Sequence, residues 1–318
     1  MDQETILQTE QRASYVKRVN MLLLLTLIIY LGYSLVLGEI IGILDGKLPV
    51  LEDPMFQLVS GQIALIAPSV FFFIRNGLQP NAYVRIKGMH PVTVLLVILF
   101  AYVSYPVIAL CNSISLYFTE NKIDGTMELL YDRYPVAVCI VAIAVIPSIV
   151  EEFVFRGVLY RTYQTVSVWK AAFLSALFFG LFHLNLNQMS YAIVMGIVFV
   201  LLNEATGTIL SSVLMHAIIN GTSVVTGAQY YKKFGTLADG TEQVSLAMIR
   251  SLCIASVFFV LFMTLLLKAM VRIEKRKEEV IALQHQPKNG KRILSVFGYL
   301  VILICILLIV ATELYKPE

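Results

Sequence analysis

Two adjacent carboxylates and an arginine follow an apolar run, residues 135–150, near the middle of this 318-residue chain. An ionisable side chain in or beside a membrane-spanning helix is costly, so it usually has a function. On a helix Glu152 and Arg156 share a face, whereas Glu151 points about 100° away. The spacing predicts that Arg156 neutralises Glu152 and that Glu151 stays available for chemistry. Pro147 removes a backbone hydrogen bond just before this group, which predicts a kink there.

Two histidines also lie in apolar runs. His183 comes four residues after Phe179, and His216 comes four residues before Asn220. Polar groups within the hydrocarbon region face the interior of the bundle and need partners there. At a rise of about 1.5 Å per residue, both histidines and Glu151 lie roughly 14 to 21 Å from the cytoplasmic ends of their predicted helices. The sequence therefore predicts one buried site near the middle of the membrane.

These residue types suit the activation of water beside a site for a negatively charged oxygen. A carboxylate in a low-dielectric cavity becomes a better general base, and a neighbouring imidazole can orient or deprotonate water. We expect Glu151 and His183 to do this. An imidazole and an amide on one helix face can donate two hydrogen bonds to an oxyanion, each worth about 3 kcal/mol, which is the role expected of His216 and Asn220. No serine or cysteine nucleophile stands out, so hydrolysis by a bound water is preferred to a covalent route.

The composition indicates an all-α polytopic membrane protein. Hydrophobic residues make up 58% of the chain and charged residues only 14%, against roughly a quarter charged in soluble proteins. The net charge of +3 is too small to suggest a nucleic-acid partner. The cysteines lie in apolar runs without CxxC spacing and are predicted to be reduced packing residues, so neither a disulfide nor a metal site is expected from them. They are Cys111, Cys139, Cys253 and Cys305.

About 20 apolar residues are needed to cross a bilayer. By this measure the sequence predicts eight to nine membrane helices, of which the fifth to seventh have the least defined ends. Counted as nine, they cover residues 21–43, 57–74, 91–118, 134–163, 169–184, 188–203, 207–226, 250–270 and 293–312.

The loops alternate in charge. Lysine and arginine dominate residues 75–90, 156–170 and 268–292, whereas acids dominate residues 44–56 and 119–133. Since positive loops face the cytoplasm, nine helices with a cytoplasmic N-terminus and an external C-terminus satisfy every loop of clear sign.

Two other charged features have simple interpretations. The basic residues of 271–292 are predicted to be a cytoplasmic connector that sets orientation, with binding of a partner or of anionic lipid as the alternative. Glu39, late in the first helix, is predicted to reach the interface near the outer surface.

In chain order, the three polar segments resemble the motifs of the CPBP family, also called the CAAX protease and bacteriocin-processing or Abi family. The match is EExxxR at residues 151–156, FxxxH at 179–183 and HxxxN at 216–220. An ordered trio is far more specific than any one motif. The resemblance covers about residues 134–226 and leaves the N-terminal third and the last 90 or so residues outside it.

The resemblance implies a core of about eight membrane helices and an intramembrane glutamate protease, whose eukaryotic relatives cut prenylated CAAX proteins. Glu151 with His183 would activate the water, and His216 with Asn220 would hold the oxyanion. Glu152 and Arg156 would support the site. No cofactor is implied, the partners would be the lipid bilayer and a membrane-associated peptide or protein substrate, and the location would be a cell membrane, in a bacterium.

The resemblance also divides the chain. Residues 1–133 would hold a polar tail and three helices, 134–226 the catalytic core, and 227–318 two C-terminal helices with a basic cytoplasmic loop.

Three other readings stay open beside the endopeptidase. The first is a zinc peptidase that uses His183, His216 and a glutamate as ligands, although HExxH is absent and the HxxxN pairing counts against it. The second is a non-proteolytic scaffold, immunity or regulatory protein that uses the polar cluster structurally. The third is a transporter, because intramembrane carboxylates also mark ion paths, but no inverted repeat is visible.

Overall fold

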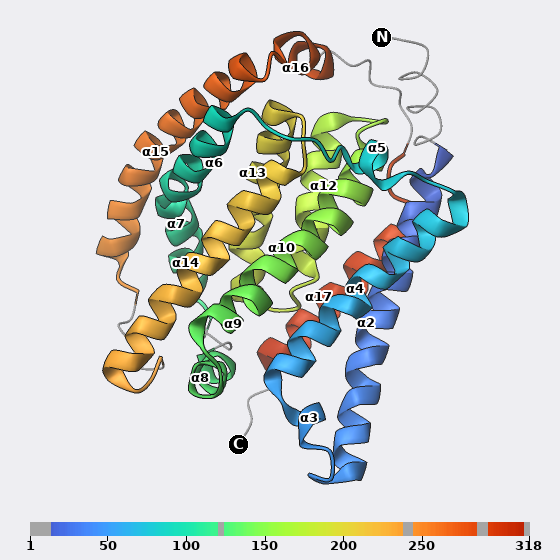
Figure 1. Ribbon diagram of the computed structural model, residues 1–318, viewed down its shortest axis with the longest axis vertical. Helices are drawn as coiled ribbons and strands as arrows, with labels where there is room; N and C mark the ends of the chain where they lie inside the picture. The colour runs from blue at the N-terminus through green and yellow to red at the C-terminus, as the bar shows by residue number, and fades with distance from the viewer. Residues whose placement is uncertain (1–13, 120–123, 238–243, 285–291, 315–318) are drawn as a thin grey trace.

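The computed structural model describes residues 14–119, 124–237, 244–284 and 292–314, which form an all-helical bundle without strands (Figure 1). The predicted all-α class is confirmed. The elements are α2 (Val16–Leu44), α3 (Pro49–Glu52), α4 (Pro54–Asn76), α5 (Pro80–Val84), α6 (Pro91–Val103), α7 (Tyr105–Leu116), α8 (Asp124–Arg133), α9 (Val136–Ile140), η1 (Val141–Val145), α10 (Ile146–Glu151), η2 (Glu152–Tyr160), α11 (Arg161–Tyr163), α12 (Val168–Leu181), α13 (Leu186–Thr206), α14 (Leu210–Phe234), α15 (Leu246–Ile273), α16 (Lys277–Gln284) and α17 (Val296–Leu314).

Eight segments of the described chain are long and apolar enough to cross a membrane. They are α2, α4, α6 with α7, α9 through α11, α13, α14, α15 and α17. Large apolar side chains such as Ile74, Leu95 and Phe258 are exposed on the outside of the bundle, where a bilayer would cover them. The protein is therefore a multi-pass membrane protein.

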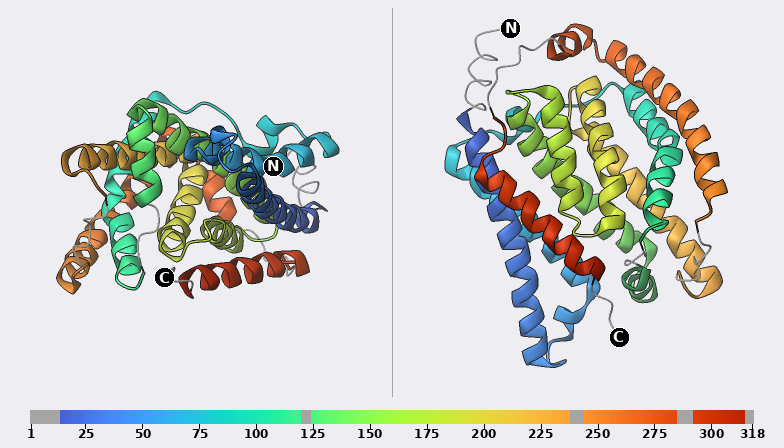
Figure 2. Two further views of the ribbon diagram at one scale, coloured as in Figure 1. Left: turned by 90° about the horizontal axis from the view of Figure 1, so that it is seen from below. Right: turned by 180° about the vertical axis from the view of Figure 1, so that it is seen from behind.

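The fifth predicted helix, residues 169–184, is instead the 14-residue helix α12. It is shorter than the roughly 20 residues that a crossing requires, so the count of nine full spans is wrong. The chain turns after Leu181, with Leu184 at a φ of 50°, and α13 packs back along α12. The pair forms a hairpin whose turn lies inside the bundle's length (Figure 2).

Charged connections of opposite sign gather at opposite ends of the bundle. The basic connections next to α5 and α16 lie at one end, and the acidic segments with α3 and α8 lie at the other (Figure 1). Helix α2 starts at the α16 end and α17 finishes near the α8 end. This is the alternation that the loop charges predict, and the assignment of the basic end to the cytoplasm stays a prediction. Lys288 and Lys291 of the basic connector lie outside the described residues.

The central helix carries the first motif and is not a regular α-helix. π-helical segments η1 and η2 flank the short α10. Pro147 is the second residue of α10, where its missing N–H leaves the carbonyl of Ile143 without its usual α-helical donor. The sequence predicted a proline kink, and the structure shows two widened turns, a feature often found at functional sites.

Close approach of α12 and α13 depends on Gly196. A Cβ atom there would lie 2.7 Å from Cα of Ala176 and 3.0 Å from Nη2 of Arg156. Small residues of this kind let membrane helices pack closely. We expect Gly196→Ala to lower the free energy of unfolding by about 1–3 kcal/mol through overpacking, measured by unfolding in detergent micelles.

Gly221 on α14 provides the matched control. Its added Cβ would meet nothing closer than 3.8 Å, so Gly221→Ala should leave stability unchanged or raise it by about 0.4–1 kcal/mol through lower entropy of the unfolded chain. Equal destabilisation by both substitutions would contradict the close-packing argument.

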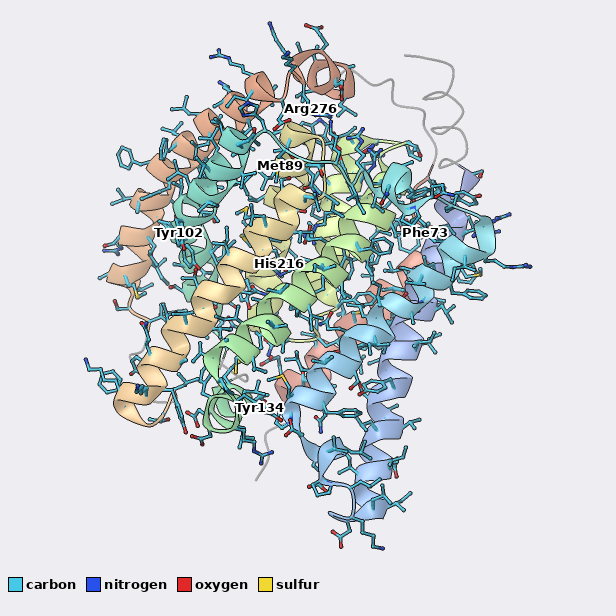
Figure 3. All side chains as sticks on the ribbon, in the orientation of Figure 1. Phe73, Met89, Tyr102, Tyr134, His216 and Arg276 are labelled. Atoms are coloured by element: carbon cyan, nitrogen blue, oxygen red, sulfur yellow. The ribbon has the colours of Figure 1, made fainter. Side chains whose placement is uncertain are left out.

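A charged clamp holds the basic end of the bundle together. The Glu204 carboxylate on α13 pairs with Arg85 at 3.1 Å and with Arg276 at 3.5 Å, and Nε of Arg276 donates to the Glu204 carbonyl at 2.9 Å. Gly207 has a φ of 75°, and a Cβ there would lie 2.5 Å from Arg276, so glycine is needed at this turn. Arg276 lies in the segment predicted to set orientation, at the α16 end of the bundle (Figure 3). It is buried and ties the segment after α15 to α13.

At the opposite end, Asp53 joins the start of α4 to the start of the central helix. Its Oδ1 accepts from the Met55 backbone N–H at 2.8 Å, and its Oδ2 accepts from the Tyr134 hydroxyl at 2.7 Å. The hydrogen bond from Tyr134 holds the pKa of Asp53 below its usual value, and the Met55 N–H and the Arg133 guanidinium act in the same direction.

A carboxyl whose pKa is lower in the folded state stabilises the fold above its unfolded pKa of about 3.9 and loses that contribution as the pH falls through the folded value. We therefore expect Tyr134→Phe to lower the melting temperature by a constant amount above about pH 5, and by less at lower pH. Thermal denaturation from pH 3 to 7 measures this. Tyr117→Phe, at an exposed tyrosine, is the control and should show no such pH dependence.

Candidate active site

A buried ion pair forms the base of the polar cluster. Nη1 of Arg156 donates to Oε1 of Glu152 at 2.7 Å, and both side chains are fully buried. The pairing predicted from the spacing of four residues is confirmed. A buried ion pair costs desolvation, so the two charges persist only because each compensates the other.

Two aromatic rings enclose the guanidinium. The Cζ atom of Arg156 lies 4.1 Å from the ring centre of Phe179 on α12 and 4.9 Å from that of Phe199 on α13. Phe199 also stacks on the His216 imidazole, with ring centres 5.1 Å apart. These cation–π and stacking contacts fix the arginine by packing as well as by charge.

His216 lies between the two glutamates. Its Nδ1 is 3.3 Å from Oε1 of Glu152, and its Nε2 is 3.9 Å from Oε2 of Glu151. A carboxylate accepts hydrogen bonds and donates none, so Nδ1 carries the proton in the first contact. The second distance exceeds a direct hydrogen bond and is one that a single water molecule can bridge.

Glu151 is the more accessible carboxylate. Its side chain is 15% exposed, whereas that of Glu152 is 0% exposed. Its Oε1 accepts a hydrogen bond from Nε2 of Gln62 on α4 at 3.4 Å. Among the described residues no arginine or lysine forms an ion pair with it, which agrees with the expectation that Glu151 stays available.

His183 lies just beyond the end of α12 and not within a helix. Its Nδ1 is 2.8 Å from the carbonyl oxygen of Phe179, an acceptor that the end of α12 would otherwise leave without a partner. The carbonyl can only accept, so Nδ1 carries the proton and Nε2 keeps a lone pair. The charge of Glu151 acts on His183, but no hydrogen bond joins the two within the described chain. The predicted direct pair of Glu151 and His183 is therefore not formed.

Asn220 is anchored to the central helix. Its Nδ2 donates to the carbonyl of Ile143 at 3.3 Å, the carbonyl that Pro147 leaves without a donor. An amide nitrogen carries two hydrogens, so one remains for another acceptor. The irregular helix thus fixes the orientation of this side chain.

The structure brings the predicted residues into one cluster at the centre of the bundle, where Figure 3 shows His216. Phe179 contacts both His183 and His216 through edge-to-face rings 5.0 and 5.9 Å apart. Sequence reasoning missed Gln62 and Phe199. Gln62 is an amide within an apolar run and could have been singled out, whereas nothing distinguishes Phe199 from other core aromatics.

No group of three or more histidine, cysteine, aspartate or glutamate side chains in the described residues has a metal-binding arrangement. This geometry gives no support to a zinc peptidase. The chelator experiment described below tests that alternative.

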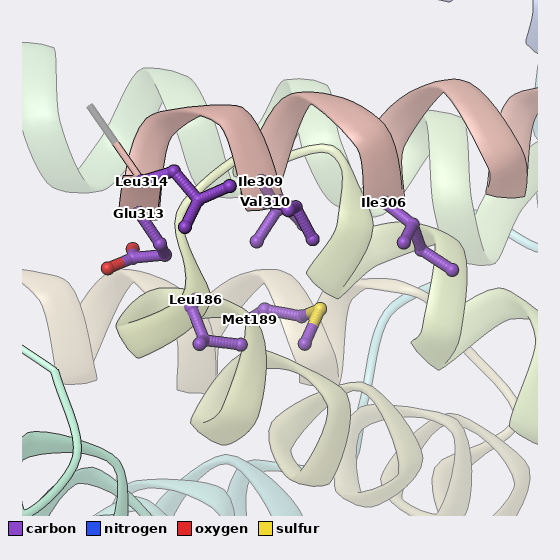
Figure 4. Close-up of a pocket in the computed structure, with 7 residues that line it drawn as sticks. All are labelled: Leu186, Met189, Ile306, Ile309, Val310, Glu313 and Leu314. Atoms are coloured by element: carbon purple, nitrogen blue, oxygen red, sulfur yellow. The ribbon is translucent and has the colours of Figure 1, made fainter.

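An apolar pocket of about 250 Å³ lies elsewhere, between the start of α13 and the end of α17 (Figure 4). Leu186 and Met189 face Ile306, Ile309 and neighbouring residues across it. Glu313 is the one ionisable residue among those that line the pocket. The pocket has no histidine beside this carboxylate, so the polar cluster is the better candidate for the site.

Comparison with known proteins agrees with the motifs. Residues 133–222 match the family described as Type II CAAX prenyl endopeptidase Rce1-like. The matched segment contains all three motifs. No curated protein and no solved structure matches the chain. The predicted resemblance is confirmed, because the central residues 133–222 of this multi-pass membrane protein match the model of the Rce1-like CAAX protease family.

Proposed function

We propose that this protein is an intramembrane endopeptidase that hydrolyses a peptide bond of a membrane-associated or prenylated, CAAX-like protein or peptide precursor. The observation that carries the proposal is the position of Glu151, a partly accessible carboxylate that lies beside His216 and near His183 within an apolar bundle. The family match of residues 133–222 supports the same reaction class.

In the proposed reaction a water molecule attacks the carbonyl carbon of the scissile bond. Glu151 accepts a proton from the water, and Nε2 of His183, which keeps its lone pair, orients that water by accepting its other hydrogen. The C–O bond forms and the carbonyl oxygen becomes an oxyanion. When the C–N bond breaks, the proton passes from Glu151 to the leaving amine, which gives one acid and one amine as products.

The oxyanion would be held by Asn220 and His216. Asn220 has one amide hydrogen left after its bond to Ile143. His216 already directs Nδ1–H to Glu152, so it can donate to the oxyanion only from a protonated Nε2. Glu152 supports that imidazolium, and Arg156 holds Glu152 in place. The His216 imidazolium would also balance the charges of the buried polar cluster, which otherwise holds two carboxylates and one arginine.

The test is cleavage of quenched fluorescent peptides, prenylated and unprenylated, by detergent-purified protein, compared with Glu151→Gln and run with and without a chelator. Cleavage that needs Glu151 and survives the chelator supports the proposal, and the panel begins to define the substrate. Loss of cleavage with chelator and recovery on adding zinc would favour a zinc peptidase. No cleavage above the Glu151→Gln background would count against an endopeptidase and for a scaffold or regulatory role.

We further propose that the basic end of the bundle faces the cytoplasm of a bacterial cell. The uneven distribution of lysine and arginine between the two ends is what supports this orientation.

A further inference from the structure

Among the described residues, Gln62 is the one residue outside the matched segment that forms a hydrogen bond with Glu151. Its Nε2 lies 3.4 Å from Oε1 of Glu151. Gln62 belongs to α4, which packs against α10 and η2 of the central helix. The two oxygens of Glu151 are thus approached from two helices, one by Gln62 and the other by His216 at 3.9 Å.

The orientation of the Gln62 amide follows from its surroundings. A carboxylate offers only acceptors when ionised, so the amide must present its NH₂ group to Glu151. The Oε1 atom of Gln62 is then buried and accepts no hydrogen bond from any described residue. Against an ionised Glu151 the reversed amide would place two acceptors face to face, so the orientation seen here is the one that suits the charged carboxylate.

The other groups that act on Glu151 are ionisable. They are Tyr30 on α2, Tyr191 on α13, His183 after α12, His216 on α14 and Arg156 on its own helix, and the carboxylate of Glu152 is the adjacent residue. Gln62 is the contact that cannot gain or lose a proton. Its NH₂ group therefore remains a hydrogen-bond donor whatever the protonation state of the rest of the cluster.

We propose that Gln62 is a positioning residue for Glu151. It holds one carboxylate oxygen, favours the charged form that accepts a proton from water, and leaves the second oxygen directed toward His216. The catalytic role given to Gln62 rests on the proposed endopeptidase function. It extends the site to α4, which lies outside the residues that match the family.

The experiment compares the wild type with Gln62→Met, which keeps the length of the side chain and removes the donor. Dicyclohexylcarbodiimide reacts with protonated carboxyl groups in apolar surroundings, so the rate at which it labels Glu151 reports the protonated fraction. Mass spectrometry of the labelled peptide measures this rate at constant pH. A hydrogen bond to a charged group shifts the protonation equilibrium of that group by about tenfold or more. We therefore expect the reagent to label Glu151 about ten times faster in Gln62→Met than in the wild type.

Gln57→Met is the matched control, because Gln57 is an exposed amide on the same helix that donates to the Leu51 carbonyl. In Gln57→Met the reagent should label Glu151 at the wild-type rate, and Glu151→Gln should show no adduct at position 151. An unchanged rate in Gln62→Met, or an equal increase in Gln57→Met, would overturn the proposal. In peptide cleavage, Gln62→Met should lower kcat with little change in KM.

The two readouts separate the two proposals. Faster labelling of Gln62→Met by a protein that cleaves no peptide would support the contact with Glu151 and contradict the endopeptidase function. Cleavage that depends on Glu151, with unchanged labelling and unchanged kcat in Gln62→Met, would support the function and contradict the role of Gln62.

Discussion

Replacing Glu151 with glutamine is expected to lower the rate of peptide cleavage by about a thousandfold or more. The substitution keeps the size of the side chain and removes the group that accepts a proton from water. Glu151 is the carboxylate of the pair that is open to a substrate, because Glu152 is fully buried against Arg156. The measurement is kcat/KM on whichever peptide of the panel the wild type cleaves.

The stability of the Glu151→Gln variant should change little, because this carboxylate has no ion pair with an arginine or a lysine among the described residues. Glu39→Gln is the control, since Glu39 is an exposed carboxylate on α2, and it should keep wild-type activity. Activity of Glu151→Gln within about tenfold of the wild type would contradict the assignment of Glu151 as general base.

Replacing Arg156 with methionine is expected to lower the free energy of unfolding by about 3–5 kcal/mol. Methionine has a similar length but no charge, so Glu152 would remain buried without its counter-ion. The stacking of the guanidinium between Phe179 and Phe199 would also be lost. Unfolding in mixed detergent micelles measures the change, and cleavage activity should fall with it because Glu152 no longer holds His216.

A double-mutant cycle tests whether the charge is the cause. Adding Glu152→Gln to Arg156→Met removes the uncompensated carboxylate, so the double variant should be more stable than Arg156→Met alone. Arg250→Met, at an exposed arginine on α15, should change stability by less than about 0.5 kcal/mol. A cycle in which the two substitutions simply add would mean that packing, and not the ion pair, stabilises this site.

Relations within one helix could be predicted because helix geometry fixes them. The contact of Glu152 with Arg156 and the separate direction of Glu151 follow from residue spacing. The membrane class follows from composition, since too few residues are charged for a soluble protein. The opposite charges at the two ends of the bundle follow from the alternation of loop charge along the chain.

Contacts between helices could not be predicted in the same way, because they depend on how each helix is rotated and shifted against its neighbours. The hydrogen bond from Gln62 to Glu151 joins residues 89 positions apart, and that from Asn220 to Ile143 joins residues 77 apart. The clamp on Glu204 likewise draws Arg85 and Arg276 from opposite sides of the matched segment. No periodic pattern in the sequence predicts which of these distant residues come into contact.

The sequence by itself determined the membrane class, the three motifs and the local pairing within the first of them, because each depends on composition or on spacing along one helix. Only the tertiary structure decided that His183 lies beyond a helix end, that α12 is too short to span, and that His216 lies between the two glutamates. The physical reason is that these features depend on packing: α13 folds back on α12, and side chains from separate helices must satisfy one another's polar groups where no water is available.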